Sequence, residues 1–225
     1  MQDKQKMTDF KTILLGHPRC GSRSLAAALS NYGLICGHER LERDGMVSWW
    51  HTGHYLGGSD FNNGKKTPSK FSVSLVGHYI RNPIDAVPSI LIENEQSGRE
   101  NNSFKFRDML LRRWYGVDIS AMPPLAAAAT SYALWNDKAA KFSDLNDAIK
   151  VENPDIRELI DKLSDDCEGG ETLRVISVPR LNTTDVKFGI NKERYSRLEI
   201  LQSVDGDIRR SLQRYFDLYS EKHNA

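Results

Sequence analysis

The stretch that decides the fold runs from Lys11 to Asn31 and reads KTILLGHPRCGSRSLAAALSN. Its first six residues, 11–16, form a short apolar run that is typical of a buried parallel strand. Residues 23–31 are rich in Ala and Leu and predict a helix, which Gly33 ends as a C-terminal cap. Residues 34–36 predict a second short strand, so the chain opens with the order of a βαβ unit.

Strands and helices continue to alternate after this opening. The run from Phe71 to Ile80 predicts the next strand, and a helix follows from Asp85 to Glu93. Residues 37–70 and 94–104 have no clear period and predict loops. Further strands are expected at 148–151 and 173–178, and further helices at 105–115, 126–142, 155–163, 192–204 and 207–219.

This alternation predicts an α/β protein with a P-loop-like three-layer fold, in which helices flank a central parallel sheet. The length of 225 residues suits one domain over 1–225, with a flexible N-terminal segment at about residues 1–10.

The composition limits the kinds of partner. There are 31 basic and 30 acidic residues, which give a net charge of +1, so we expect no nucleic-acid partner. The three cysteines have neither metal-ligand spacing nor the pattern of a disulfide framework. No window reaches the roughly 18 apolar residues of a membrane span, and the first ten residues lack a signal-peptide core. We therefore expect a reduced, cytoplasmic protein with no transmembrane segment and no bound metal.

The loop between the first strand and the first helix has the composition of an anion site. Backbone N–H groups and the helix dipole converge at such a junction. Gly21 allows close approach of the backbone, and Ser22 and Ser24 offer hydroxyl donors. Arg19 and Arg23 can add charge-assisted hydrogen bonds. The loop therefore predicts a site for a phosphate-rich ligand.

The same loop departs from the nucleoside-triphosphate P-loop. The spacing from Gly16 to Gly21 matches, but Ser22 stands in place of the lysine, and Arg23 replaces the Ser or Thr that holds Mg²⁺. The later strand ends in Arg81, where a metal site would need an aspartate. These differences predict phosphate binding without a metal.

A second motif, RNPIDAVPS, occupies residues 81–89 after the later strand. Pro83 and Asp85 suit the first turn of a helix. Arg81 and Ser89 meet on one anion if that helix turns back over the end of the strand.

Together the two motifs resemble those of the sulfotransferases that use 3′-phosphoadenosine 5′-phosphosulfate (PAPS). In that family a P-[KR]-x-G-[ST] loop holds the 5′-phosphosulfate, and here the loop spans Pro18 to Ser22. The second signature, R-[ND]-P-x-D-x-x-x-S, holds the 3′-phosphate through its Arg and Ser. The resemblance covers about residues 12–30 and 72–92, and it is closer to the carbohydrate and bacterial enzymes than to the aryl and steroid enzymes. Residues 149–154 and 180–183 resemble later family segments weakly.

The resemblance implies specific roles for individual residues. Arg19 bridges the transferring sulfonate and the leaving 5′-phosphate, although the family more often has lysine there. The residues expected to bind PAPS are Arg19, Cys20, Gly21, Ser22, Arg23, Ser24, Arg81 and Ser89. Arg23 replaces a small residue or Thr, so it either adds a phosphate contact or is a solvated helix arginine. Cys20 is read as a tolerated small residue rather than a redox group.

The general base is the most open assignment. In several carbohydrate sulfotransferases a glutamate at about this distance after the loop is the base, which favours Glu39, with His38 second. In the aryl and steroid branch the base is a histidine, a role that His54 or His51 would take. The alternative for Glu39 is a salt bridge to a neighbouring arginine.

The implied activity is transfer of a sulfonate from PAPS to a hydroxyl or amine of a small-molecule, glycan or lipid acceptor, with carbohydrate or glycolipid preferred. Aromatic groups at 45–55 and 104–122 suit sugar stacking or ordinary core contacts equally. Arg107, Arg112 and Arg113 are expected to form a solvated helix face rather than a contact with an anionic acceptor. The alternatives are a P-loop nucleotide kinase and a non-catalytic nucleotide-binding protein on the same scaffold. The oligomeric state stays open.

Overall fold

The computed structural model describes residues 8–57, 71–96, 102–164 and 195–220. Their strands form one five-stranded, all-parallel sheet, which confirms the predicted α/β class. The spatial order is β2-β3-β1-β4-β5. The strands are β1 (Thr8–Leu15), β2 (Cys36–His38), β3 (Gly45–Ser48), β4 (Phe71–Ile80) and β5 (Ile149–Lys150).

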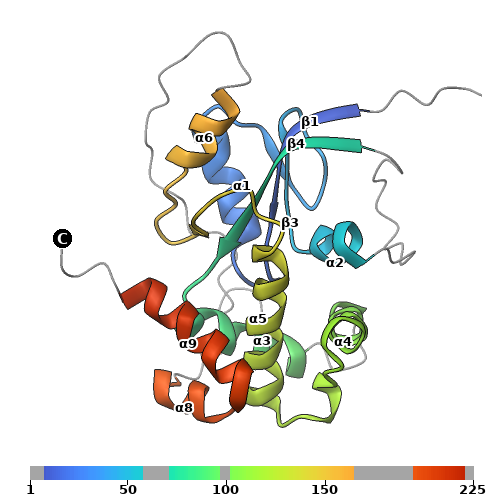
Figure 1. Ribbon diagram of the computed structural model, residues 1–225, viewed down its shortest axis with the longest axis vertical. Coiled ribbons are helices and arrows are strands. Elements are labelled where there is room, and N and C mark those ends of the chain that lie inside the picture. The colour runs from blue at the N-terminus through green and yellow to red at the C-terminus, as the bar shows by residue number, and fades with distance from the viewer. Residues whose placement is uncertain (1–7, 58–70, 97–101, 165–194, 221–225) are drawn as a thin grey trace, which may run out of the picture.

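Helices cover both faces of the sheet. In Figure 1, α1 and α6 lie on one side of the central strands and α2 lies on the other. The helices are α1 (Ser22–Asn31), α2 (Trp50–Gly57), α3 (Pro83–Gln96), α4 (Asn102–Tyr115), α5 (Pro124–Ala140), α6 (Arg157–Ser164), α8 (Arg197–Gln202) and α9 (Gly206–Ser220), with a short 3₁₀ turn at Ile119–Ala121.

The alternation of side chains along β1 explains the two layers of helices. Leu14 packs in one cluster with Leu25 and Leu29 of α1. Ile13 and Leu15 point to the opposite face and pack in another cluster that includes Ala139 of α5. Because successive side chains of a strand alternate between faces, an apolar run without alternation is buried on both sides.

The segment 37–70, predicted as loops, contains β3 and α2, so that part of the prediction was wrong. The four residues of β3 are all buried, but the strand is too short to give a clear sequence period. β3 lies between β1 and β2, so the strand expected at 34–36 pairs with β3 and not with β1. That strand is also shifted to residues 36–38.

Smaller differences occur at the ends of elements. β1 begins at Thr8, so residues 8–10 belong to the sheet and not to a flexible segment. α3 extends to Gln96 and α4 begins at Asn102, inside the region predicted as a loop. Gly33 has a φ of 80° and follows α1, as expected of a C-terminal cap. The strand predicted at 173–178 lies outside the described residues.

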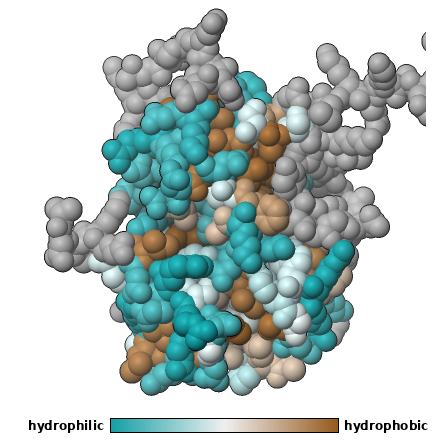
Figure 2. Space-filling model, viewed as in Figure 1, coloured by the Kyte–Doolittle hydropathy of each residue, from teal (hydrophilic) through white to brown (hydrophobic). Residues whose placement is uncertain are grey.

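The surface is mixed in character. In Figure 2, apolar side chains form separate patches between hydrophilic ones. Among the described residues, the large apolar side chains that are exposed are far apart in the sequence: Ile35, Met109, Phe142 and Leu198. Within the described ranges, no helix has the length and hydropathy needed to cross a bilayer.

Candidate functional site

Both motif loops lie at the edge of the sheet where the parallel strands end. β1 and β4 are neighbours, with Leu15 opposite His78, and Figure 1 shows the two strands side by side. The loop after β1 and the residues after β4 therefore emerge at the same edge. Ligands of open α/β sheets bind outside the carboxyl ends of the strands.

Direct hydrogen bonds join the two motifs. Arg19 donates from Nε to the hydroxyl of Ser89 over 3.2 Å. Arg81 donates from Nη1 to the backbone carbonyl of Arg19 over 3.3 Å. Ser89 is fully buried, and the side chains of Arg19 and Arg81 are 13% and 28% exposed. The structure thus brings Arg19, Arg81 and Ser89 into one cluster.

The loop after β1 has a backbone suited to an anion. Arg19 and Gly21 have φ angles of 70° and 82°, in the left-handed region. Gly21 precedes α1 without a side-chain cap, and the first turn of α1 contains no acidic residue. Uncapped N–H groups and the helix dipole favour a negative ligand there. A side chain at position 21 would come within 2.6 Å of Val151, so both the φ angle and the space require glycine.

The other predicted residues of this loop differ in their surroundings. Ser22 and Ser24 are buried, whereas Arg23 is exposed. Cys20 is a free, fully buried cysteine in the main core cluster. Burial raises the pKa of its thiol to about 12, although nearby Arg81 acts in the opposite direction. The thiol is therefore protonated at neutral pH and packs as a small apolar group.

Arg81 is fixed by groups from α5, α9 and the segment after β5. The hydroxyl of Tyr132 donates to the backbone carbonyl of Arg81 over 2.6 Å. Oε1 of Glu152 lies 3.9 Å from Nε of Arg81 and accepts the backbone N–H of Asn82. Tyr219 donates its hydroxyl to Oε2 of Glu152 over 2.8 Å. The segment 149–154 thus contacts the second motif, whereas residues 180–183 lie outside the described residues.

Glu39, the predicted base, is a buried carboxylate just after β2. Oε2 accepts the hydroxyl of Ser48 at 2.6 Å, and Oε1 accepts the backbone N–H of Trp49 at 2.9 Å. Its backbone has a φ of 55°, in the left-handed region. Burial, and then the nearby charge of Glu39, raise the pKa of the Tyr79 hydroxyl well above its usual range. Because the Tyr79 ring lies against Gly16, Glu39 is close to the start of the loop.

Of the histidine candidates, His38 and His51 lie in different environments. His38 has a side chain that is 38% exposed, with Nδ1 3.9 Å from Oε1 of Glu39. His51 is buried, and its Nδ1 lies 3.0 Å from the hydroxyl of Ser48. Since Ser48 donates to Glu39, His51 completes a chain of glutamate, serine and histidine. His54 belongs to α2, but its side chain lies outside the described part of the structure.

Sequence reasoning missed a second carboxylate beside the loop. Oε2 of Glu93 is 3.9 Å from Nε of Arg19, is buried and accepts no hydrogen bond from the described residues. Glu93 is one helical turn after Ser89 on α3, so both face Arg19. The spacing of four residues is the only sequence signal that would have indicated this position.

Arg107 was predicted on a solvated helix face, and that prediction was wrong. Its side chain is fully buried and donates to Oδ1 of Asn94, to the hydroxyl of Ser131 and to the carbonyl of Ser103, at 2.7, 3.1 and 3.3 Å. Burial lowers its pKa to about 10, although Glu93 opposes this, so Arg107 is a cation at neutral pH. Ser131 also lies 2.8 Å from Nε2 of His17, which connects Arg107 to the loop.

The fold and these loops define a parallel α/β protein whose strand-end loops suit an anionic ligand. Comparisons of the chain with protein-family models, with curated proteins and with solved structures gave no match.

Proposed function

We propose that the chain is a sulfotransferase that moves a sulfonate from PAPS to a hydroxyl or amine of an acceptor. The observation that best supports this proposal is the pair of hydrogen bonds joining Arg19 to Ser89 and Arg81 to Arg19. PAPS has anionic groups at both ends of one adenosine, and these contacts put two cationic groups from separate motifs within reach of one ligand.

The residues after β1 fit the 5′ end of such a ligand. The uncapped start of α1 offers N–H groups, and Gly21 leaves the backbone open to close approach. Arg19 adds a guanidinium that lies 3.9 Å from the carboxylate of Glu93. A bound anion would gain a charge-assisted contact from this guanidinium.

The residues after β4 fit the 3′-phosphate. Tyr132 holds the backbone carbonyl of Arg81, and Glu152 lies 3.9 Å from its guanidinium. Ser89 adds a buried hydroxyl. Because ATP and ADP have no 3′-phosphate, these two side chains would distinguish the proposed nucleotide from the common ones.

PAPS supplies an activated sulfonate when it is bound. The role of Arg19 in the transfer is to stabilise the charge that develops on the departing phosphate. A base must also take the proton of the acceptor hydroxyl. Glu39 remains our first candidate, and its carboxylate accepts hydrogen bonds from the Ser48 hydroxyl and the backbone N–H of Trp49. Glu93 and His51 are the other candidates.

The acceptor that we propose is a carbohydrate or glycolipid. Its stacking surface would be Trp49, which is partly exposed, and not Trp50. The ring of Trp50 is buried and stacks on Phe106 with ring centroids 4.2 Å apart. Of these two tryptophans, Trp50 therefore belongs to the core and Trp49 reaches the surface.

Isothermal titration calorimetry tests the proposal with 3′-phosphoadenosine 5′-phosphate (PAP), the product nucleotide, against ADP. We expect a strong preference for PAP, and we expect Arg81→Ala to weaken PAP binding about ten- to hundredfold, as for loss of a charged hydrogen bond. Arg157→Ala on α6 is the matched control, because this arginine is exposed. Equal affinity for PAP and ADP would refute the proposal, and Mg²⁺-dependent ATP binding would favour the kinase.

A sulfonate-transfer screen over sugars, glycolipids and phenols then separates an enzyme from a non-catalytic binding protein. With an acceptor found, Glu39→Gln, Glu93→Gln and His51→Gln identify the base. The base is the residue whose variant keeps its affinity for PAP but loses turnover at both low and high pH.

A further inference from the structure

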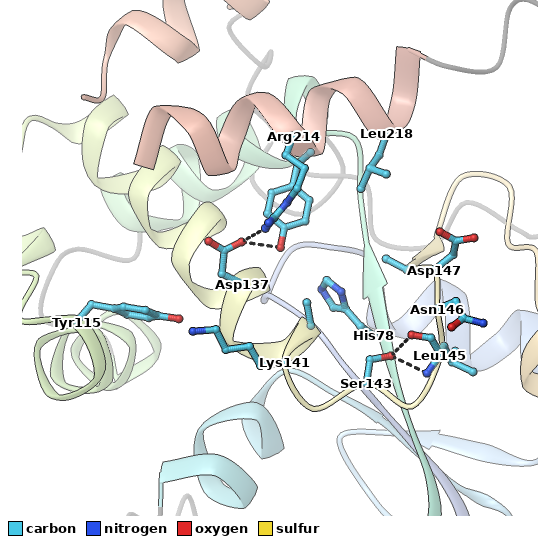
Figure 3. Close-up of a pocket in the computed structure, with 13 residues that line it drawn as sticks. His78, Tyr115, Asp137, Lys141, Ser143, Leu145, Asn146, Asp147, Arg214 and Leu218 are labelled. Atoms are coloured by element: carbon cyan, nitrogen blue, oxygen red, sulfur yellow. Dashed lines mark hydrogen bonds and ion pairs between the residues drawn. The ribbon is translucent and has the colours of Figure 1, made fainter. Parts of the chain in front are cut away.

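A cavity lies away from the two motif loops. It has a volume of about 380 Å³, is partly open to solvent, and is bordered by α9, the end of α5, Tyr115 of α4, residues 143–148 and His78 of β4 (Figure 3). Of the described residues that line it, none belongs to either motif. The ring of Tyr132 separates the cavity from the motif loops. Its centroid lies 6.3 Å from that of His17, in the loop after β1, and 5.6 Å from that of Tyr215, in the cavity wall. The cavity is therefore a separate place for a ligand.

The carboxylate of Asp137 in the cavity wall is already satisfied. Oδ2 accepts the hydroxyl of Ser211 at 2.6 Å. Oδ1 accepts the guanidinium of Arg214 at 2.5 Å and the hydroxyl of Tyr215 at 2.9 Å, as Figure 3 shows. With an ion pair and two further donors, Asp137 is compensated and is not left to attract a cation.

Two donors of the same wall have no acceptor within the part of the chain that the structure describes. Figure 3 shows Tyr115 and Lys141 pointing toward one another. The hydroxyl of Tyr115 is buried and has no hydrogen-bond partner among the described residues. The ammonium of Lys141 lies 5.9 Å from the centre of the Tyr115 ring, and no carboxylate in the described ranges pairs with it. A buried donor without a partner costs stability, which a bound acceptor would restore.

Tyr115 and Lys141 present hydrogen-bond donors at one end of the cavity. Burial, and then nearby Asp137, raise the pKa of Tyr115 to about 12, so its hydroxyl is a donor at neutral pH. Burial lowers the pKa of His78 to about 4, so its ring is neutral. Asp147 also lines the cavity and, like Lys141, is exposed to solvent, where charge is screened.

The remaining wall is apolar. Leu145 is buried, Ala148 and Leu218 are partly buried, and all three line the same cavity. A volume of this size accommodates a ligand larger than a simple ion, since ligand pockets usually measure roughly 300–1,000 Å³. The occupant therefore needs an acceptor group at one end and an apolar body.

We propose that this cavity binds a small organic oxyanion, with its phosphate, sulfate or carboxylate group on Lys141 and Tyr115 and its apolar part against Leu145 and Leu218. The proposal is independent of the function proposed above, because it uses no residue of either motif.

Titration of the full chain with phenyl phosphate, followed by calorimetry, tests the proposal. We expect saturable binding that Lys141→Met weakens at least tenfold and Tyr115→Phe weakens about three- to tenfold. Lys105→Met, which removes the same charge from an exposed position on α4, should leave the affinity unchanged. Phenol should bind far more weakly than phenyl phosphate. If benzoate binds as tightly as phenyl phosphate, the ligand is a carboxylate. If benzoate binds more weakly, the ligand is a phosphate or sulfate ester.

Competition shows which site is occupied. Saturating PAP and the Arg19→Ala variant should both leave phenyl phosphate binding unchanged if the ligand is in this cavity. The proposal is overturned if either one abolishes binding, if phenyl phosphate does not bind at millimolar concentration, or if Lys141→Met behaves like Lys105→Met.

Discussion

Gly21 is subject to two separate constraints, the left-handed φ of 82° and the close approach of Val151. Replacement by alanine should therefore cost about 1–2 kcal/mol for the backbone and a further roughly 1–3 kcal/mol for the steric contact. We expect Gly21→Ala to lower the melting temperature and to abolish PAP binding, because the loop must shift. Thermal unfolding and calorimetry measure the two effects.

Gly116 provides the control for that measurement. It has a φ of 69°, and a side chain there would meet no atom within 4 Å. Gly116→Ala therefore isolates the backbone cost. If Gly21→Ala is no more destabilising than Gly116→Ala, the contact with Val151 does not constrain the loop.

At the residue scale, the motif residues could be predicted, whereas their partners could not. Arg19, Gly21, Arg81 and Ser89 come from two short motifs whose spacing is visible in the chain. The hydrogen bonds of Glu39 and the approach of Glu93 to Arg19 arise from contacts between separate elements, which no local pattern encodes.

At the scale of elements, α4 supplies a buried cation to the layer behind the loop. Arg107→Met should destabilise the protein by about 3–5 kcal/mol, because Asn94 and Ser131 lose their donor and Glu93 loses its nearby positive charge. For a chain of this length, this corresponds to a fall in melting temperature of roughly 10 °C. Differential scanning calorimetry measures it.

Arg112→Met on the same helix is the matched variant. Its guanidinium is open to solvent, so the ion pairs with Asp108 and Asp118 are screened and their loss should cost little stability. A similar loss of stability in both variants would mean that the burial of Arg107 has no special energetic role.

Long elements were predicted well, and short or buried polar ones were not. β4 has the predicted bounds, and α5 and α9 lie within two residues of theirs, because a long apolar or amphipathic pattern fixes an element. β3 has only four residues, and its place between β1 and β2 depends on tertiary pairing. Arg107 was misjudged because a charged residue at helical spacing is usually solvated.

At the scale of the whole molecule, two buried histidines make stability depend on pH. Burial lowers the pKa of His17 well below its usual range, with Arg107 adding to the effect, and it lowers that of His78 to about 4. The unfolded chain binds these protons near pH 6.5. The contribution of these histidines to the free energy of unfolding is therefore fully present above about pH 6.5 and is lost as the pH is lowered toward 4. For His78 alone, this loss amounts to up to about 3 kcal/mol.

Thermal melts between pH 7.5 and 4.5 measure this dependence. We expect His78→Gln to have a shallower slope than the wild-type chain, and His38→Gln, at an exposed position, to keep the wild-type slope. A melting temperature that rises as the pH falls would contradict the assigned protonation states.

The central claim is that two strand-end loops hold the two ends of one nucleotide, and ³¹P NMR of PAP tests it most directly because its two phosphates give separate signals. We predict that the wild-type chain shifts both signals, and that Arg81→Ala returns the 3′ signal toward its free position while the 5′ signal stays shifted. If the protein leaves either signal unchanged, or if Arg81→Ala affects both signals equally, the account is contradicted.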